Sequence, residues 1–385
     1  MTKICVVTGT RAEYGILSEL MGRMRDSSDI ELQIVATNMH LMPEYGMTVN
    51  EIIGDGFEVD WRVPMPLEGD SAKSTVKGMA AGLDGFAEAF EALKPDMVMI
   101  LGDRYEMLMV ASAALIFRIP VIHLHGGEIT EGAYDDSIRH AITKLSTWHF
   151  TATERYRKRV IQMGEDPERV FCSGSPATDG ITRFATMSLP ELEESIGFEL
   201  GEDFLLCTFH PVTTQPGDEE RQTAALLNAL DQRDEKVLFT MPNSDTGGRR
   251  VAEMIEEWTS AHPGRAVAVT SLGRKRYYSA LAHCGAVIGN SSSGLIEAPS
   301  FGVPTLNIGD RQKGRDRGNT VIDCKAEENE IVGGLQKVMS EDFRSFCRDH
   351  GKNPYNRAGT VDYIMEKILT FNPHQQKTFH DIEPI

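Results

Sequence analysis

Short apolar segments alternate with longer amphipathic segments along this chain, and the alternation occurs in two series. Within the first series, GILSELMGRMRDS and AAGLDGFAEAFEAL carry apolar residues at helical spacing. Near-continuous apolar strands separated by amphipathic helices are typical of a parallel sheet that is covered on both faces. The strands expected on this pattern are residues 3–8, 32–37, 96–101, 119–124, 148–153 and 169–174, followed in the second series by 203–209, 236–241, 265–270, 285–290 and 303–308.

The two series predict two domains, joined by an acidic connector at about residues 175–200 that contains Pro190. A length of 385 residues also favours about two domains. We therefore expect an α/β protein with two Rossmann-like, doubly wound domains that face one another across a cleft, where ligands bind at the carboxyl ends of the strands. The expected parts are an N-terminal domain over 1–175, a C-terminal domain over 176–357, and a final helix (about 358–371) and tail, 358–385, that pack back on the N-terminal domain.

Composition narrows the range of partners. The formal net charge of −18 argues against nucleic acid and acidic membrane surfaces as partners. The apolar run in MTKICVVTGT is too short for a secretory signal, and no segment reaches the roughly 18 apolar residues of a membrane span. We expect a cytoplasmic protein. Its six single cysteines are expected to be buried thiols of a reducing compartment, because they show no disulfide or zinc spacing.

Two motifs of the first series follow expected strands directly. TGTRAEYG (8–15) lacks the dinucleotide-binding glycine pattern, yet it places Arg11 where a helix begins, and free backbone N–H groups at such a position stabilise phosphate. The alternative is an ordinary strand-to-helix turn with a surface arginine. LGDRYE (101–106) places Asp103 and Arg104 at the carboxyl end of another strand. Here the alternative is an aspartate that caps the next helix.

The stretch LHGGEITEGAYDDSIRH (124–140) gathers ionisable groups just beyond a buried strand. Glu128, Asp135 and Asp136 supply carboxylates that Arg139 and His140 can orient. Carboxylates that crowd one another in a partly dry cleft have raised pKa values, which makes a general acid or base available near neutral pH. The alternative is a helix N-terminus with favourable acids and a solvent-facing ion pair from Asp135 to Arg139.

The second series carries a candidate anion site. TFHPVTTQ (208–215) places His210 at a strand end, and Arg311 and Arg315 in NIGDRQKGRDRGN can pair with phosphate. A structural histidine is the alternative for His210. GNSSSGLIEAPSFGVP (289–304) places serine hydroxyls and backbone N–H groups before a helix carrying Glu297, an arrangement suited to a diphosphate. The residues of this expected nest are Asn290, Ser291, Ser292, Ser293 and Gly294.

These motifs, together with NPYNRAG, resemble in their order the UDP-N-acetylglucosamine 2-epimerase family, specifically its hydrolysing, sialic-acid-pathway branch. The resemblance extends from residue 3 to about residue 370. It implies a glycosyltransferase-B-like architecture. It also implies anti elimination of UDP from C1 and C2 of UDP-N-acetylglucosamine, giving 2-acetamidoglucal. Water then adds to release N-acetylmannosamine for sialic acid biosynthesis.

The resemblance also implies roles for individual residues. Arg11 resembles a phosphate-side arginine, Glu297 a ribose-binding acid, and His210 a histidine near the diphosphate. Relatives that read His-x-Glu at the strand end have a catalytic glutamate where this chain has His125, so either His125 or Glu128 is expected to be the C2 base. The expected catalytic residues are Asp103, His125, Glu128, Asp135 and His210. The expected substrate-binding residues are Arg11, Arg104, Asn290, Ser291, Ser292, Ser293, Gly294, Glu297 and Arg311.

Three alternatives stay open at this point. The same elimination could act on another nucleotide sugar, such as GDP-N-acetylglucosamine or a UDP-2,4-diacetamido sugar of a legionaminic-type pathway. A retaining glycosyltransferase shares the architecture but needs an acceptor groove rather than a cluster of acids near C2. A nucleotide-sugar sensor would not need the acids. We expect a UDP-sugar as the ligand, no cofactor or metal, and a homodimer or homotetramer as the assembly.

Overall fold

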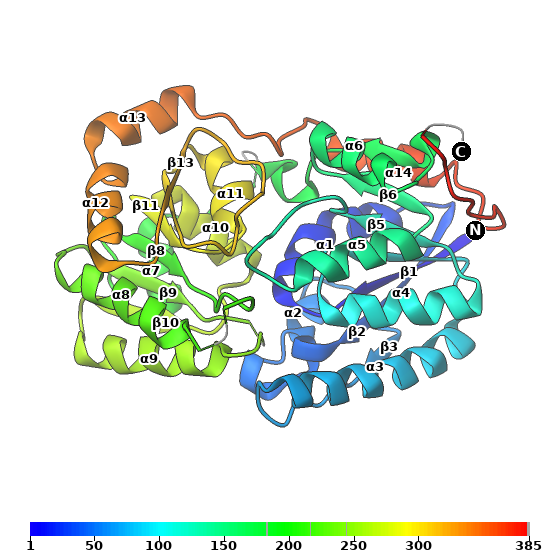
Figure 1. The fold of residues 1–385 in the computed structure, drawn as a ribbon, viewed down its shortest axis with the longest axis horizontal. Helices are drawn as coiled ribbons and strands as arrows, with labels where there is room; N and C mark the ends of the chain where they lie inside the picture. Colours follow the sequence, from blue (N-terminus) through cyan, green and yellow to red (C-terminus); the bar gives the residue numbers. More distant parts are fainter. Residues whose placement is uncertain (182–183, 216, 244, 383–385) are drawn as a thin grey trace. The chain divides into compact units, whose positions relative to one another are not determined.

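The computed structural model describes residues 1–181, 184–215, 217–243 and 245–382, which form two compact units. We call them unit 1 (Met1–Glu128, Asp135–Asp179 and Tyr355–Ile385) and unit 2 (Ile129–Tyr134 and Gly180–Pro354). Each unit contains one parallel sheet with helices around it, as Figure 1 shows. The expected fold class, two Rossmann-like α/β domains, is confirmed.

The sheet of unit 1 has the strand order β3-β2-β1-β4-β5-β6-β7, and every pairing is parallel. The strands are β1 (Thr2–Thr8), β2 (Ile30–Thr37), β3 (Trp61–Val63), β4 (Met97–Leu101), β5 (Val121–Leu124), β6 (Trp148–Thr151) and β7 (Val170–Cys172). The helices are α1 (Arg11–Arg25), α2 (Val49–Gly54), α3 (Ala72–Leu93), α4 (Tyr105–Phe117), α5 (Asp135–Leu145), α6 (Glu154–Gln162) and α14 (Thr360–Ile368).

Strand β1 shows why these strands are apolar throughout. Ile4 and Val6 belong to a core cluster with residues of α1 and α14, whereas Cys5 and Val7 belong to another cluster with residues of α3 and α4. Successive side chains of a strand point to opposite faces, so a sheet covered on both faces buries every position. The sheet therefore lies between two helical layers.

Unit 2 repeats this plan with the strand order β10-β9-β8-β11-β12-β13, again entirely parallel. The strands are β8 (Leu205–Thr208), β9 (Val237–Thr240), β10 (Ala266–Val269), β11 (Ala286–Gly289), β12 (Thr305–Ile308) and β13 (Val321–Cys324). The helices are α7 (Leu189–Ile196), α8 (Glu219–Asp231), α9 (Gly248–Ala261), α10 (Gly273–His283), α11 (Ser293–Ile296), α12 (Glu328–Val338) and α13 (Glu341–His350).

In each sheet the strand order reverses at one point, between β1 and β4 in unit 1 and between β8 and β11 in unit 2. Loops that leave the carboxyl ends of strands diverge at such a switch point, and open α/β sheets bind ligands there. Arg11, the first residue of α1, comes shortly after β1, and Asp103 comes after β4, while His210 follows β8 and Asn290 follows β11. The topology thus places predicted residues at both switch points.

The structure adds two strands that the sequence pattern missed. Strand β3 has only three residues, and β13 is partly exposed and carries the charged Asp323, so neither produces a buried apolar run. Two cysteines also differ from the expectation of burial. Cys172 and Cys324 are only partly buried, because they lie on β7 and β13 at the edges of their sheets.

The unit boundaries differ from the expected ones in one internal segment and by three to four residues at the two places where the units join. Ile129–Tyr134, expected in the N-terminal domain, belongs to unit 2, where the backbone of Glu131 bonds that of Lys313 and the side chain of Thr213 accepts from the Tyr134 N–H. The other boundaries fall after Asp179 and Pro354. The expected connector and tail include residues 182–183 and 383–385, which lie outside the described residues.

Two neighbouring glycines of α12 test the packing of unit 2. A Cβ atom on Gly334 would lie 2.4 Å from Cδ1 of the buried Leu306, whereas a Cβ on Gly333 would meet nothing within 4 Å. We expect Gly334→Ala to lower the free energy of unfolding by about 1–3 kcal/mol, because the core has no space for an added methyl group. Gly333→Ala is the matched control and should be neutral or stabilising by up to about 1 kcal/mol. Urea unfolding measures both, and equal stabilities would contradict this packing.

Candidate active site

A buried arginine organises the candidate site of unit 1. Arg139 on α5 is fully buried, and its guanidinium contacts the Asp103 carboxylate, the Asp136 carboxylate (3.3 Å) and the backbone oxygen of Glu128 (3.0 Å). Asp103 comes from the loop after β4, and Glu128 from the stretch after β5. A buried guanidinium is stable only when charges and hydrogen-bond acceptors surround it. Arg139 therefore holds three separate segments of the chain together.

His125 and Glu128, the two candidates for the C2 base, lie side by side. Nδ1 of His125 is 3.1 Å from Oε1 of Glu128, and its Nε2 is 3.0 Å from Oγ of Ser175. Both side chains are buried. Nε2 shares a hydrogen bond with the serine hydroxyl, and Nδ1 faces the carboxylate at ion-pair distance. The structure thus places the two candidates in direct contact.

The backbone of His125 has φ = 64°, in the left-handed region. Residues with a side chain adopt this region at a cost of about 1–3 kcal/mol, and such residues concentrate at functional sites. Because β5 ends at Leu124, this turn directs the chain away from the sheet immediately after the strand. It is the turn that brings the ring to Glu128 and Ser175.

Asp135, the third predicted acid, is the first residue of α5 and is largely buried. The positive end of the helix dipole favours a carboxylate there. The ion pairs within this helix involve its neighbour Asp136, which contacts Arg139 at 3.3 Å and Nε2 of His140 at 3.6 Å. Asp135 and Asp136 thus place two acids in the first turn of the helix that also carries Arg139.

The sequence analysis missed a second acidic pair at the same switch point. Oε2 of Glu13 accepts hydrogen bonds from the backbone N–H groups of Gly9 (2.8 Å) and Thr10 (3.1 Å). A Cβ on Gly9 would lie 2.6 Å from Oε1 of Glu106, which binds Nε of Arg104 at 2.7 Å. The Thr-x-x-Glu pattern over residues 10–13 is a capping-box signal that could have identified Glu13.

This pair changes the interpretation of the first loop. The free N–H groups expected to bind phosphate are, at Gly9 and Thr10, already donated to Glu13, so that expectation is wrong for these two groups. Arg11 is the first residue of α1. Burial, reinforced by the charge of Glu106, raises the pKa of Glu13 from its ordinary value of 4.5 to about 8.

In unit 2, Asn290 connects the loops that follow β8 and β11. Its side chain accepts from the backbone N–H of His210 (2.7 Å) and donates to the backbone oxygen of the same residue (2.8 Å). Arg311 and Gln312 donate to the backbone oxygen of Asn290 at 3.4 and 2.8 Å. Arg311 also pairs with Asp245 at 3.3 Å. The predicted residue Asn290 thus contacts both of the other two, His210 and Arg311.

The expected serine nest differs in detail. Helix α11 begins at Ser293 and ends at Ile296, so Glu297 lies just beyond the helix that was expected to carry it. The short helix gives way to a turn of 3-10 helix containing Pro299, which cannot continue an α-helix. The N–H of Gly294 bonds the backbone oxygen of Ser291 at 3.3 Å, and Oγ of Ser293 accepts from Tyr277 at 2.7 Å.

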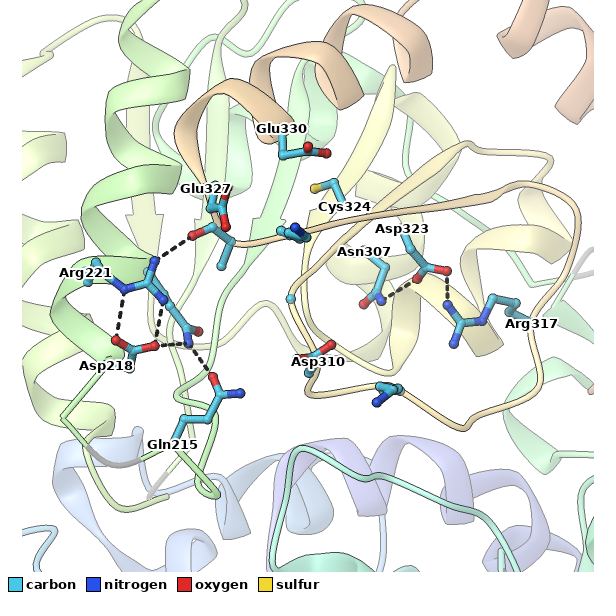
Figure 2. Close-up of a pocket in the computed structure, with 15 residues that line it drawn as sticks. Gln215, Asp218, Arg221, Asn307, Asp310, Arg317, Asp323, Cys324, Glu327 and Glu330 are labelled. Atoms are coloured by element: carbon cyan, nitrogen blue, oxygen red, sulfur yellow. Dashed lines mark hydrogen bonds and ion pairs between the residues drawn. The ribbon is translucent and has the colours of Figure 1, made fainter.

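A pocket of about 650 Å³ lies in unit 2 beside β12 and β13, and Figure 2 shows its lining. Its arginines face acids: Arg221 binds Asp218 at 2.6 Å, and Arg317 binds Asp323. None of the predicted site residues lines this pocket. Within the described parts of the chain, no group of three or more His, Cys, Asp or Glu side chains could hold a metal ion. The same parts contain no helix long and apolar enough to cross a membrane.

Comparison with known proteins places the chain among enzymes that act on nucleotide sugars. The family model of UDP-N-acetylglucosamine 2-epimerase matches residues 22–369. The chain belongs to this family. It is 41% identical, over 89% of its length and 88% of the relative, to the hydrolysing GDP/UDP-N,N'-diacetylbacillosamine 2-epimerase of Campylobacter jejuni. It is also 38% identical to polysialic acid biosynthesis protein P7 of Escherichia coli, over 100% of this chain and 98% of that protein.

The fold agrees with this membership. The crystal structure of UDP-GlcNAc 2-epimerase from Neisseria meningitidis bound to UDP-GlcNAc superposes with a TM-score of 0.81, at 17% identity, covering 96% of this chain and 100% of that one. At this identity the likeness shows a common fold. The family expected from the motifs and the expected glycosyltransferase-B-like architecture are therefore confirmed.

The raised pKa of Glu13 predicts a pH-dependent stability. Between about pH 4.5 and 8 the folded state keeps a proton that the unfolded chain has lost, so Glu13 makes stability fall as the pH rises through this range. Glu13→Gln keeps an acceptor for the two N–H groups but removes the titration. The wild type should therefore lose more stability than Glu13→Gln from about pH 5 to about pH 8 in urea unfolding. Glu91→Gln, at an exposed position of α3, is the control, and parallel curves for wild type and Glu13→Gln would refute the assignment.

Proposed function

We propose that this protein is a hydrolysing 2-epimerase that converts a UDP-linked 2-acetamido sugar and water into UDP and the free 2-epimeric sugar. A base removes the C2 proton, the electron pair forms the C1–C2 double bond, and UDP leaves with the electrons of the C1–O bond. Water then adds across the double bond and places its hydroxyl on C1. The new proton on C2 arrives on the face opposite to the one from which the first proton was removed, so C2 is inverted. Family membership supports the reaction class, and the arrangement around Arg139 supports the proton transfers.

The observation that carries the proposal is the buried pair of His125 and Glu128 beside Arg139. The C2 proton is weakly acidic, so its removal requires a base that is shielded from water and correctly oriented. We assign this role to Glu128, with His125 fixing the direction of the carboxylate. Asp103, held by Arg139, and Asp135, at the start of α5, are assigned the proton deliveries of the elimination and the hydration.

The departing diphosphate carries negative charge that must be stabilised as its bond to C1 breaks. We assign this role to His210 and Arg311 of unit 2, which Asn290 holds together. Ser291, Ser292 and Glu297 remain the proposed contacts for the rest of the nucleotide. Arg11 and Arg104 of unit 1 are proposed to add positive charge on the phosphate side, with Glu106 fixing Arg104.

The identity of the sugar has two candidates. The motif resemblance favours UDP-N-acetylglucosamine, and the relative named for polysialic acid biosynthesis supports a sialic acid route. The Campylobacter jejuni relative, at slightly higher identity, is named for N,N'-diacetylbacillosamine and supports a UDP-2,4-diacetamido sugar. Both sugars carry the 2-acetamido group that the reaction requires, so the same residues can act on either. A location in the cytoplasm and assembly as a homodimer or homotetramer remain part of the proposal.

Single substitutions test the assigned roles. Asp103→Asn and Glu128→Gln should each lower kcat by about a hundredfold or more, since each removes a proton-transfer group while keeping its shape. The affinity for UDP, measured by calorimetry, should stay close to that of the wild type, because neither substitution removes a group assigned to the diphosphate or the nucleotide. Asp84→Asn, at an exposed position on α3, is the control. Full turnover in both variants would remove the proposed roles.

Product analysis separates the candidate reactions and sugars. Incubation with UDP-N-acetylglucosamine or UDP-N,N'-diacetylbacillosamine in deuterated water should release UDP and a free sugar carrying deuterium at C2, detected by NMR. The ratio of the two kcat/KM values identifies the preferred sugar. Return of an intact UDP-linked epimer would indicate a non-hydrolysing enzyme. Release of UDP only when an acceptor is added would indicate a glycosyltransferase.

A further inference from the structure

The chain continues beyond α14 into a tail that packs on unit 1. Lys377 in this tail is only 23% exposed. Its ammonium group donates to the backbone oxygens of Ser146 (2.6 Å), Lys144 (2.8 Å) and Thr143 (3.3 Å) and pairs with Oε2 of Glu165 at 2.8 Å. Three of these residues form the carboxyl end of α5 and the turn that follows it. A side chain from the tail thus caps the helix that carries Arg139.

Glu165 makes this cap a closed network. It accepts from Lys144 (2.6 Å) and from Nε2 of His149 (3.0 Å) as well as from Lys377. Burial opposes its ionisation, but the hydrogen bonds and charges of these partners outweigh burial and lower the pKa of Glu165 from 4.5 to about 2. An ionised carboxylate therefore stays beneath the ammonium group at neutral pH, and the charge of Lys377 is compensated.

Other contacts fix the position of the tail. The N–H of His380 bonds the backbone oxygen of Gly164 at 2.9 Å, and Arg169 donates to the backbone oxygen of Gln376 at 2.8 Å. The ring of Phe379 packs against Gly164, and the ammonium of Lys144 lies 4.8 Å from the centre of that ring. The tail residues before and after Lys377 are thus fixed by their own contacts, and the position of Lys377 does not depend on its own bonds alone.

Two connections lead from the capped end of α5 to Asp103. The first is the helix itself, whose Arg139 binds Asp103. The second begins at Thr143, whose hydroxyl is 3.4 Å from Nδ1 of His123; the Nε2 of that ring is 2.7 Å from the backbone oxygen of Gly102, the residue before Asp103. Burial lowers the pKa of His123 to about 3, so the ring is neutral and can donate at one nitrogen while accepting at the other.

From this geometry we infer that Lys377 is a positioning residue for the proton-transfer cluster. By binding carbonyl groups at the end of α5, it fixes the helix along its axis and so fixes Arg139 relative to Asp103 and Glu128. Helices of this length owe little of their stability to the helix alone, and their terminal carbonyl groups need partners. A shift of about 1 Å at reacting groups can lower turnover a hundredfold. The inference rests on the proposed function, since it concerns the same cluster.

The experiment compares Lys377→Met, Lys377→Arg and the wild type. Methionine keeps the apolar stem but cannot donate, so kcat should fall about tenfold or more, while KM and the affinity for UDP change less than twofold. Arginine can still donate to the carbonyl groups and should recover most of kcat. Amide hydrogen exchange over residues 135–145 should be at least fivefold faster in Lys377→Met than in the wild type and nearly normal in Lys377→Arg.

Lys367→Met is the matched control, because Lys367 is similarly half-buried but its ammonium group contacts Glu366 and the ring of Tyr363 on its own helix, α14. It should leave both readouts unchanged. Normal kcat and normal exchange in Lys377→Met would overturn the inference, as would an equal fall in the control. A loss of kcat that arginine does not rescue would assign Lys377 to general stability instead. If the wild type releases UDP from no sugar nucleotide, the proposed function fails, while hydrogen exchange still decides whether the tail holds α5.

Discussion

The guanidinium of Arg139 is the interaction on which the candidate site of unit 1 depends. A fully buried positive charge is tolerable only with close negative partners, and here the partners are Asp103, Asp136 and the backbone at Glu128. These groups repel one another in the absence of the arginine. The guanidinium that neutralises these groups also fixes their spacing. The same contacts therefore stabilise the fold and position the residues of the site.

The sheet topology explains why these groups meet. Each sheet reverses its strand order once, and the loops beside the reversal carry Asp103 in unit 1 and His210 and Asn290 in unit 2. Glu128 and Arg311 follow the next strand of their sheets, β5 and β12. Unit 1 provides mainly acids, whereas unit 2 brings together His210 and Arg311 through Asn290. This division matches a reaction in which protons move at the sugar carbon while charge develops on the departing diphosphate. In the proposed function, two copies of one architecture therefore serve two different electrostatic tasks.

Much of the fold followed from the sequence because strands buried on both faces leave a continuous apolar signal. Strands β3 and β13 lacked that signal, one being too short and the other half exposed. Residues directly after strands, such as Asp103 and His210, were found for the same reason. Glu13 was missed although its capping-box pattern is local, whereas Lys377 was missed because its partners are distant in the sequence. The assignment of Ile129–Tyr134 to unit 2 likewise depends on tertiary contacts that no local pattern encodes.

The left-handed backbone conformation at His125 limits which residues can replace it during evolution. Glycine would relieve the conformational strain but would remove the imidazole ring. Asparagine can adopt the left-handed conformation, but its side chain lacks the two ring nitrogens of histidine. Branched residues would be penalised both in folding and in chemistry. Few neighbouring variants are therefore viable, and the position is expected to resist drift more strongly than the buried apolar residues of β5 beside it, which can exchange for one another.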